Sequence, residues 1–303
     1  MEFENIIGNN DVKTYLSNSI KQNNILHSYL FLGTEGIGKL LIAKAFAKKI
    51  LCQNNVKDVE CNCKSCLCFD GKNHPDFLVV NEESESIKIE QIRDITEKVI
   101  EKPIISNKKG YIINDCDKMT KEAQNCLLKT LEEPPEFVVL ILISSNENLI
   151  LNTIKSRCMS IKFDPIADQL LKEYALKNLE YNVINENMLK SFHGSIGKAI
   201  TRKNNQEKYL QIEEIISHIE TKDIVDIMLE AKILYDKENI EDILDYIIVC
   251  LFSHAKQNKQ YIYCIEYVNK CLQRIKSNSN FDMCIDTMLF NIWEELNENR
   301  YGN

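Results

Sequence analysis

The sequence contains no apolar run as long as the roughly 18 residues that a membrane-spanning helix needs. Its first residues show no basic segment followed by an apolar one, so we expect no secretory signal and a cytoplasmic protein. A basic stripe is also missing, because the formal net charge is -8 and the Lys and Arg residues are dispersed. Since phosphate neutralisation supplies most of the affinity of a DNA-binding protein, we expect any contact with DNA to be shared with partners.

Low-complexity linkers and repeats of a fixed period are missing as well. The chain is 44% hydrophobic and 27% charged, a composition typical of ordered proteins, which argues against a disordered chain. With 303 residues it can bury a sizeable core, and we expect two or three domains.

The first half of the sequence alternates short apolar runs with helical patterns. The apolar runs, which we predict to be strands, are residues 28–32, 76–80, 110–113, 138–144 and 159–163. The helical patterns between them are residues 38–51, 87–100 and 121–133. Short apolar strands separated by helices predict an α/β fold with a parallel sheet that is covered on both faces.

The strand signals stop after Pro165, and the remaining chain has helical spacing. Residues 166–205 predict a small helical domain, and the pattern is helical throughout from residue 206 onward. The clearest apolar stripe extends from Phe281 to Leu296. We therefore predict a nucleotide-binding-type α/β domain over 1–165, a small helical domain over 166–205 and an all-α domain over 206–303.

Residues 33–39 form a glycine-rich loop, GTEGIGK, between the first strand and a helix. The phosphate-binding Walker A pattern requires this context, and its key positions here are Gly33, Gly36, Gly38 and Lys39. The backbone N–H groups of such a loop can hold phosphates, and Lys39 can reach the terminal ones. The sequence leaves two alternatives open: ATP binding without hydrolysis, or survival of the loop only as a tight strand-to-helix turn.

Two positions that hold magnesium in such a site carry other residues. The Walker A pattern continues with Ser or Thr, where this chain has Leu40, and the acidic residue after the third strand is replaced by Asn114. Mg²⁺ needs hard oxygen ligands; leucine offers none and asparagine only a neutral one. Asp115 is the acidic group left near the nucleotide position. We therefore expect magnesium binding to be lost and ATP hydrolysis to be badly impaired.

Further motifs carry a family resemblance. They are Ile6-Ile7-Gly8 and the runs HSYLF at 27–31, LLKTLEEPP at 127–135 and TIKSRC at 153–158. Through these motifs, in this order, the chain resembles the AAA+ subunits of the bacterial replicative clamp loader, part of DNA polymerase III. The resemblance implies a AAA+ domain, a helical lid over 166–205 and a collar domain over 206–303. It also implies a hetero-pentamer with gamma/tau and delta subunits, which reaches the sliding clamp and primed DNA as a complex, with no membrane partner.

In that family the Ser-Arg-Cys motif supplies an arginine finger to the ATP of a neighbouring subunit. The corresponding residue is Arg157, and Thr153 lies one helical turn before it on the same face. The alternative is an ordinary surface arginine in a salt bridge.

The lid helix of ATP-hydrolysing members carries a sensor-two arginine in a Gly-Ser-x-Arg pattern, where this chain has Gly197. Gly197, Leu40 and Asn114 all differ from the residues of the ATP-hydrolysing members. With these differences, the chain resembles the non-motor, delta-prime-type members, which help load the clamp. The alternative is an active gamma/tau-type ATPase.

Cysteines cluster after the first helix of the α/β domain, where the family carries a zinc module (here about 52–68). In a reducing compartment such a cluster indicates a metal site before it indicates disulfides. The family resemblance and the C-x-x-C turn favour a structural zinc site with four ligands, Cys52, Cys61, Cys63 and Cys66. Cys68 is a substitute, because only one residue separates Cys61 from Cys63 where the family has two. The alternative is reduced cysteines acting as small hydrophobic residues. We assign His74 a packing role.

Overall fold

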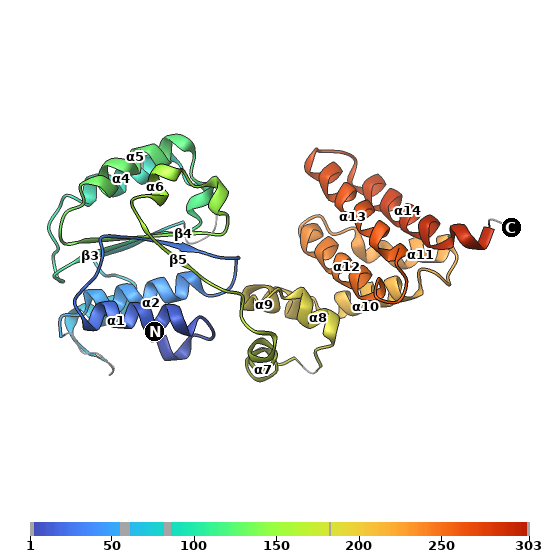
Figure 1. Ribbon diagram of the computed structural model, residues 1–303, viewed down its shortest axis with the longest axis horizontal. Coiled ribbons are helices and arrows are strands. Elements are labelled where there is room, and N and C mark those ends of the chain that lie inside the picture. Colours follow the sequence, from blue (N-terminus) through green and yellow to red (C-terminus); the bar gives the residue numbers. More distant parts are fainter. Residues whose placement is uncertain (1–2, 55–60, 82–85, 182, 302–303) are drawn as a thin grey trace. The chain divides into compact units, whose positions relative to one another are not determined.

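The structure is a computed structural model that describes residues 3–54, 61–81, 86–181 and 183–301. The chain divides into two compact units (Figure 1). The first consists of Met1–Leu170 and Gly194–Gly197, and the second of Leu171–His193 and Lys198–Asn303. The separation of the lid from the collar domain stays a prediction. In the part of the chain that the structure describes, none of the helices combines the length and apolar character of a transmembrane segment.

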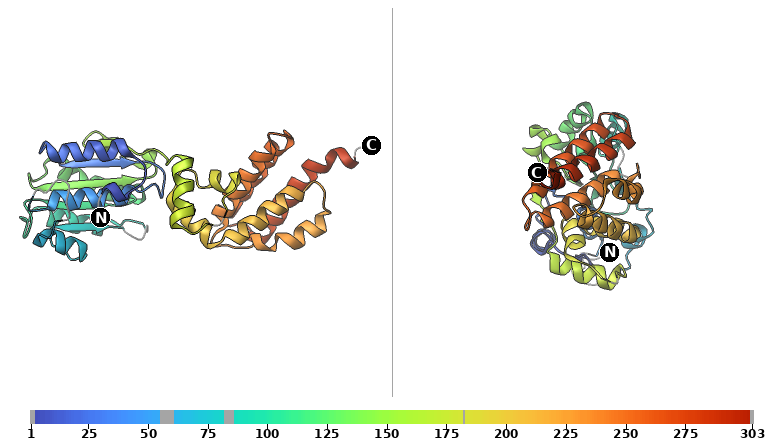
Figure 2. Two further views of the ribbon diagram at one scale, coloured as in Figure 1. Left: turned by 90° about the horizontal axis from the view of Figure 1, so that it is seen from below. Right: turned by 90° about the vertical axis from the view of Figure 1, so that its right-hand side faces the viewer.

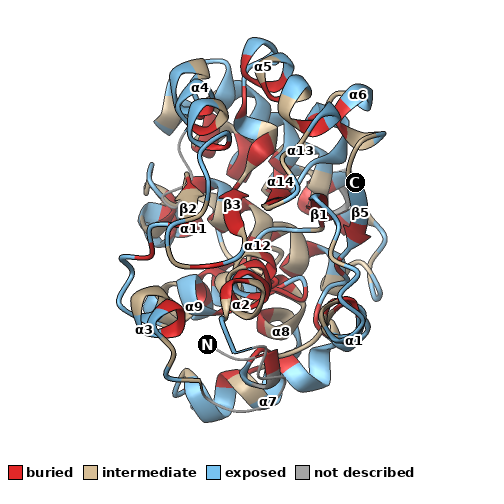
Figure 3. Ribbon diagram, turned by 90° about the vertical axis from the view of Figure 1, so that its left-hand side faces the viewer, coloured by how far each residue is buried: buried red, intermediate tan, exposed pale blue. Residues whose placement is uncertain are grey.

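A five-stranded parallel sheet forms the centre of the first unit, in the order β2-β3-β4-β1-β5. Its strands are β1 (Ser28–Leu32), β2 (Phe77–Val80), β3 (Lys109–Ile113), β4 (Val138–Ser144) and β5 (Met159–Lys162). Every residue of β1, β3 and β4 is buried; Figure 3, where β1 and β3 are labelled, draws buried residues in red. Strands of this kind are mostly apolar, because both of their faces are covered. The predicted α/β fold is confirmed.

Helices cover both faces of this sheet (Figure 1). Residues on β1 alternate between two cores: Tyr29 packs with α1 and α2, whereas Leu30 packs with α4 and α5. The alternation follows from the two-residue period of a strand, which directs successive side chains to opposite faces. The helices of this unit are α1 (Asn10–Lys21), α2 (Lys39–Leu51), α3 (Lys64–Asp70), α4 (Ile89–Lys98), α5 (Lys121–Glu132) and α6 (Asn152–Lys155).

The second unit is helical in its described residues (Figure 2). The apolar stripe predicted near the C-terminus lies on α14, where Ile285, Leu289 and Ile292 are completely buried. Helix α13 packs against both α12 and α14. The helices that lie wholly or mostly in this unit are α7 (Asp168–Asn178), α8 (Glu186–Ser191), α9 (Ile196–Asn204), α10 (Gln206–His218), α11 (Ile224–Glu230), α12 (Ile240–His254), α13 (Gln260–Lys276) and α14 (Phe281–Tyr301).

A buried arginine joins α9 to α12 inside the second unit. The Arg202 side chain is fully buried, and its Nη2 lies 2.7 Å from Asp245 and 3.2 Å from Asp242. The rings of Tyr209 and Tyr246 lie within 5.5 Å of its guanidinium carbon. A charge removed from water needs such partners, because an unpaired buried ion is strongly destabilising.

Candidate functional site

The glycine-rich loop connects β1 to α2, with Lys39 as the first helical residue. Gly36 and Gly38 have φ angles of 75° and 94°, in the left-handed region that glycine adopts without strain. The sequence-predicted Walker A loop therefore has its expected position between strand and helix. Its backbone path depends on glycine.

The Lys39 side chain points back into this loop. Its Nζ donates hydrogen bonds to the carbonyl oxygens of Gly33, at 2.6 Å, and Thr34, at 2.7 Å. Burial lowers the pKa of the Lys39 ammonium group, although the nearby carboxylates of Asp115 and Asp117 oppose that shift. The cation that could reach a terminal phosphate is thus held by two carbonyls of its own loop.

The Gly194–Gly197 segment lies directly against the phosphate loop. The Gly197 N–H donates to the Gly36 carbonyl at 3.1 Å. A Cβ atom added to Gly36 would lie 2.2 Å from Ser195 Oγ, and one added to Gly197 would lie 2.9 Å from Gly36 Cα. Two glycines therefore allow a backbone-to-backbone contact at the position where ATP-hydrolysing relatives are expected to have an arginine.

Asn114, after β3, forms a reciprocal pair with Asn81, after β2. The Asn114 side-chain amide donates to the Asn81 carbonyl, and the Asn81 amide donates to the Asn114 carbonyl, both at 3.2 Å. Leu40 is partly buried and packs against the core on the α2 side of the sheet. The two residues at the expected magnesium positions thus make packing and backbone contacts.

Two acidic residues follow Asn114. Asp115 pairs with Lys118 at 3.3 Å. Asp117 accepts hydrogen bonds from the backbone N–H and the hydroxyl of Ser145, at 3.2 and 3.1 Å, and so holds the turn after β4. The sequence motifs do not predict a role for Asp117. The sequence feature that could have indicated one is a second acidic residue two positions after Asp115.

Arg157 lies at the surface after α6, with 34% of its side chain exposed. Its guanidinium pairs with Glu132 at 2.7 Å and donates to the Thr153 carbonyl at 2.9 Å. The Ser28 hydroxyl donates to the Arg157 carbonyl at 2.7 Å, which fixes the backbone beside β1. Thr153 therefore contacts Arg157 through its main chain. The arginine-finger role stays a prediction, and the observed pair with Glu132 is the kind of salt bridge that the alternative describes.

The predicted cysteine cluster comes together. The sulfur atoms of Cys52, Cys61, Cys63 and Cys66 all lie within 4.8 Å of one another. A zinc ion with Zn–S bonds of about 2.3 Å has ligand sulfurs about 3.8 Å apart, so four thiolates with this spacing fit one tetrahedral ion. Cys68 is described but is outside this group, which supports the preferred ligand set over the substitute.

Local hydrogen bonds stabilise a thiolate at the N-terminus of α3. Burial raises the pKa of Cys63, but the backbone N–H groups of Cys66 and Gln53 and neighbouring thiols outweigh it and lower that pKa to about 6. Burial raises the pKa of Cys66. A bound cation favours the thiolate form of every ligand, because the metal binds only deprotonated sulfur.

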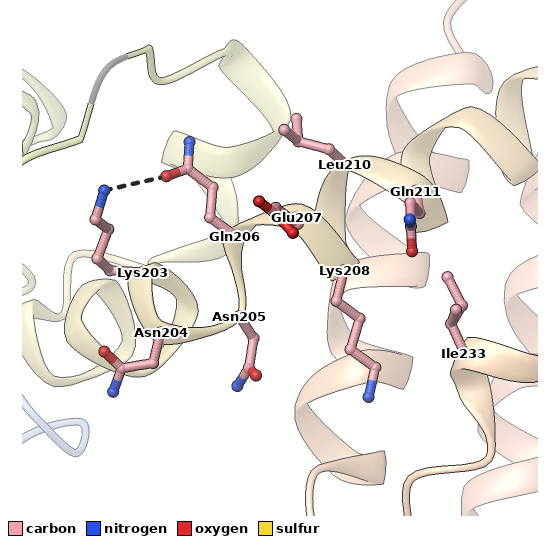
Figure 4. A pocket seen from close by; sticks show the side chains of 9 residues that line it. All are labelled: Lys203, Asn204, Asn205, Gln206, Glu207, Lys208, Leu210, Gln211 and Ile233. Atoms are coloured by element: carbon pink, nitrogen blue, oxygen red, sulfur yellow. Dashed lines mark hydrogen bonds between the residues drawn. The ribbon is translucent and has the colours of Figure 1, made fainter.

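A surface hollow lies in the second unit, where α9 ends and α10 begins (Figure 4). Lys203 and Lys208 are among the residues that line it. Lys203 donates to the Glu180 carbonyl at 2.6 Å and to Gln206, and Lys208 pairs with Asp236 at 2.6 Å. Since both cations are held by partners within the chain, we assign no ligand to this hollow.

Comparison with known proteins identifies the family. The family described as "DNA polymerase III, delta subunit" matches residues 8–167, more than half of the chain. The chain belongs to this family. It is 32% identical over 196 residues to the DNA polymerase III subunit delta' of Bacillus subtilis, covering 65% of this chain and 59% of that protein.

Other relatives place the chain in the clamp-loader family as a whole. It is 32% identical over 173 residues to the subunit tau/gamma of Haemophilus influenzae, covering 57% of this chain and 25% of that protein. The matches thus span between a quarter and three fifths of these relatives' lengths. A DNA polymerase III gamma subunit-related protein of Thermotoga maritima shares the fold, with a TM-score of 0.52, 16% identity and coverage of 93% of this chain and 99% of that one.

Proposed function

We propose that this clamp-loader chain is a non-motor, delta-prime-type subunit that does not hydrolyse ATP. In this role it helps to load the sliding clamp onto primed DNA in the cytoplasm and supplies Arg157 to the ATP of a neighbouring subunit. The proposal separates it from the gamma/tau type, to which it is also similar in sequence.

The proposal that this chain does not hydrolyse ATP rests mainly on the contacts inside its own phosphate loop. Lys39 donates to two loop carbonyls, and the Gly36 and Gly197 backbones are in direct contact. An arginine at position 197 would have to displace the loop, because even a Cβ atom there lies 2.9 Å from Gly36 Cα. A bound triphosphate also needs magnesium to neutralise the charge that develops during phosphoryl transfer. The chain has Leu40 and Asn114 where magnesium ligands are expected.

The surface position of Arg157 supports a role toward a neighbour. Its pair with Glu132 lies at the surface, with 34% of the Arg157 side chain and 49% of the Glu132 side chain exposed, and surface pairs of this kind contribute less than about 1 kcal/mol. An arginine finger contributes about 10³- to 10⁵-fold in rate, or roughly 4 to 7 kcal/mol at the transition state. The free energy lost when Arg157 leaves Glu132 is therefore small compared with the transition-state stabilisation that Arg157 would give to a neighbour's ATP.

We also propose that the cysteine cluster holds a structural zinc ion. Cys52, Cys61, Cys63 and Cys66 would fill all four positions, which leaves none for water or substrate. The ion would join the C-terminal end of α2 to the start of α3.

The proposed partners are gamma/tau and delta subunits in a hetero-pentamer that packs through the collar domain. The net charge of -8 gives this chain little attraction for DNA by itself. Primed DNA and the sliding clamp are therefore proposed to be reached through the complex.

Reconstitution with gamma/tau and delta subunits tests the arginine finger. Arg157→Ala is expected to lower turnover at the neighbouring ATP by at least about 100-fold, since a finger supplies 10³ or more. The free energy of unfolding of the isolated chain should change by less than about 1 kcal/mol. DNA-stimulated ATPase of the complex, with assembly checked by gel filtration, measures the effect.

Lys155→Ala is the matched control, because it removes a cation two positions away, whose Nζ donates to the Glu147 carbonyl at 3.4 Å. If Arg157→Ala and Lys155→Ala leave the same ATPase rate as the unchanged complex, the finger assignment is wrong. ATPase activity of the isolated chain that disappears in Lys39→Ala would instead identify a gamma/tau-type motor.

A further inference from the structure

The Leu51 carbonyl, at the end of α2, accepts two buried hydroxyl groups. Ser65 Oγ donates to it at 2.7 Å and Ser106 Oγ at 2.8 Å. Both serines are at least nine-tenths buried. A hydroxyl has a single hydrogen, so each serine can interact with a third group only as an acceptor once that hydrogen is directed at Leu51.

His74 is the third group. Its Nε2 lies 2.9 Å from Ser65 Oγ and 3.2 Å from Ser106 Oγ. The Ser106 hydroxyl can also donate to Ser65 Oγ, at 3.2 Å. With either acceptor neither serine hydrogen is directed at the histidine, so Nε2 carries the proton and donates it. The other ring nitrogen, Nδ1, accepts from the Asp76 backbone N–H at 3.0 Å, so it carries no proton. His74 is therefore neutral with its hydrogen on Nε2, and burial, which lowers its pKa, agrees with this assignment.

Asp76 fixes the remaining part of this network. Its carboxylate accepts three backbone hydrogen bonds, from Ile104 and Ile105 at 2.7 Å and from Ser106 at 2.8 Å. Only 2% of Asp76 is exposed. Its carboxylate cannot also orient the histidine as in a hydrolytic triad, because the histidine Nδ1 is bonded to the backbone. The network is a brace between backbone segments rather than a reactive centre.

The brace members sit beside the cysteines on both sides of the metal position. Leu51 precedes Cys52, and Ser65 lies between Cys63 and Cys66. The Leu51 carbonyl and the Ser65 hydroxyl are thus a direct bond between the α2 half and the α3 half of the cluster. A change in this bond changes the distance between Cys52 and the pair on α3.

We propose that Ser65, His74 and Ser106 are positioning residues for the metal site, which hold the two halves of the cysteine cluster at the spacing of one ion without touching that ion. The inference rests on the proposed zinc site and not on the proposed arginine finger. Outer partners of this kind typically change metal affinity about 10- to 100-fold.

Zinc release from the full chain tests the brace. Ser65→Ala is expected to raise the rate of zinc transfer to a chromophoric chelator by about 10-fold or more, because the two halves lose their direct bond. His74→Phe removes the shared donor while keeping a ring of similar size, and it should act in the same direction. Circular dichroism establishes that each variant is folded before zinc is measured.

Ser191→Ala is the matched control, since Ser191 is also completely buried and donates one hydrogen bond, to Met188, in the second unit. Its zinc release rate is expected to stay within about 2-fold of the unchanged chain, because Ser191 belongs to the other compact unit and shares no partner with the cysteines' network. If the unchanged chain holds one zinc and Ser65→Ala releases it at the control rate, the brace is overturned while the zinc site stands. If the unchanged chain holds no zinc, both are overturned, and the ATPase result with Arg157→Ala is unaffected.

Discussion

Helix α2 has a candidate site at each end. The two sites differ in how many of the expected ligand-binding groups the chain retains. At the C-terminal end, Cys52 joins three cysteines of the following segment at distances that suit a single ion. At the N-terminal end, Lys39 bonds to its own loop, and Gly36 lies against Gly197. The first site has every group that zinc needs. The second has the backbone path of a phosphate loop without the expected magnesium ligands.

The two ends of α2 differ because a zinc site depends on side chains, whereas a glycine loop depends on its backbone. A tetrahedral zinc site needs four side-chain ligands, so replacing one of them removes a bond to the ion. A glycine loop needs glycine where its φ angles are positive and where another backbone approaches closely. Such a loop can therefore keep its shape through packing after residues that handle phosphate and metal have changed.

Cys66→Ser is expected to have the largest effect, at the cysteine end of α2. The variant should lose its zinc, and its free energy of unfolding should fall by roughly 3 kcal/mol or more, because the binding energy of a structural zinc is part of the folding energy. Metal analysis and urea unfolding with and without chelator measure the two quantities.

Cys68→Ser is the matched control for that change, since Cys68 lies on the same helix but outside the group of four. It should keep one zinc per chain. Loss of zinc in both variants, or in neither, would mean that the ligand set is wrong.

Gly36→Ala tests the phosphate-loop end and is expected to have an intermediate effect. The new Cβ would meet Ser195 Oγ at 2.2 Å, and the residue has a φ angle of 75°. Strain of this kind costs about 1 to 3 kcal/mol of unfolding free energy. Adding Ser195→Ala should restore part of that loss, because it removes the nearest atom. An unchanged urea midpoint in Gly36→Ala would contradict the packing role of this loop.

The smallest effect is expected in the pH dependence of the brace at the end of α2. Burial raises the pKa of Asp76, but three backbone N–H groups outweigh it and hold that pKa below its ordinary value of 3.8. The stability that this carboxylate contributes is therefore present above about pH 4 and is lost as the pH falls through the folded pKa. The difference in unfolding free energy between the unchanged chain and Asp76→Asn should shrink from pH 5 to pH 3. A constant difference would mean that the charge of Asp76 does not contribute.

Much of the first unit could be predicted from the sequence because its signals are local. The strand at 138–144 has the predicted bounds, and α2 ends at the predicted Leu51. The predicted strand at 159–163 ends one residue earlier in the structure, at Lys162. An apolar run or a glycine loop identifies an element without any information on its neighbours, although the ends of elements depend on hydrogen bonds that the pattern does not contain.

The site residues divide in the same way. The four cysteines could be predicted as one site, because they lie close together in the sequence, between Cys52 and Cys66. Asn81 with Asn114, and Arg202 with Asp245, could not, because each pair joins segments more than 30 residues apart. A single sequence contains no local pattern that identifies such partners or that distinguishes a buried arginine from an exposed one.

Several features can be read from the amino-acid order alone: the alternation of strands and helices, the glycine loop, the cysteine spacing and the loss of the expected magnesium ligands. Each of these depends on residue type and local order. Three others required the folded chain: which cysteine lies outside the cluster, where Lys39 points, and the contact of Gly197 with Gly36. Those outcomes depend on distances between separate segments, which packing sets and a linear pattern does not contain.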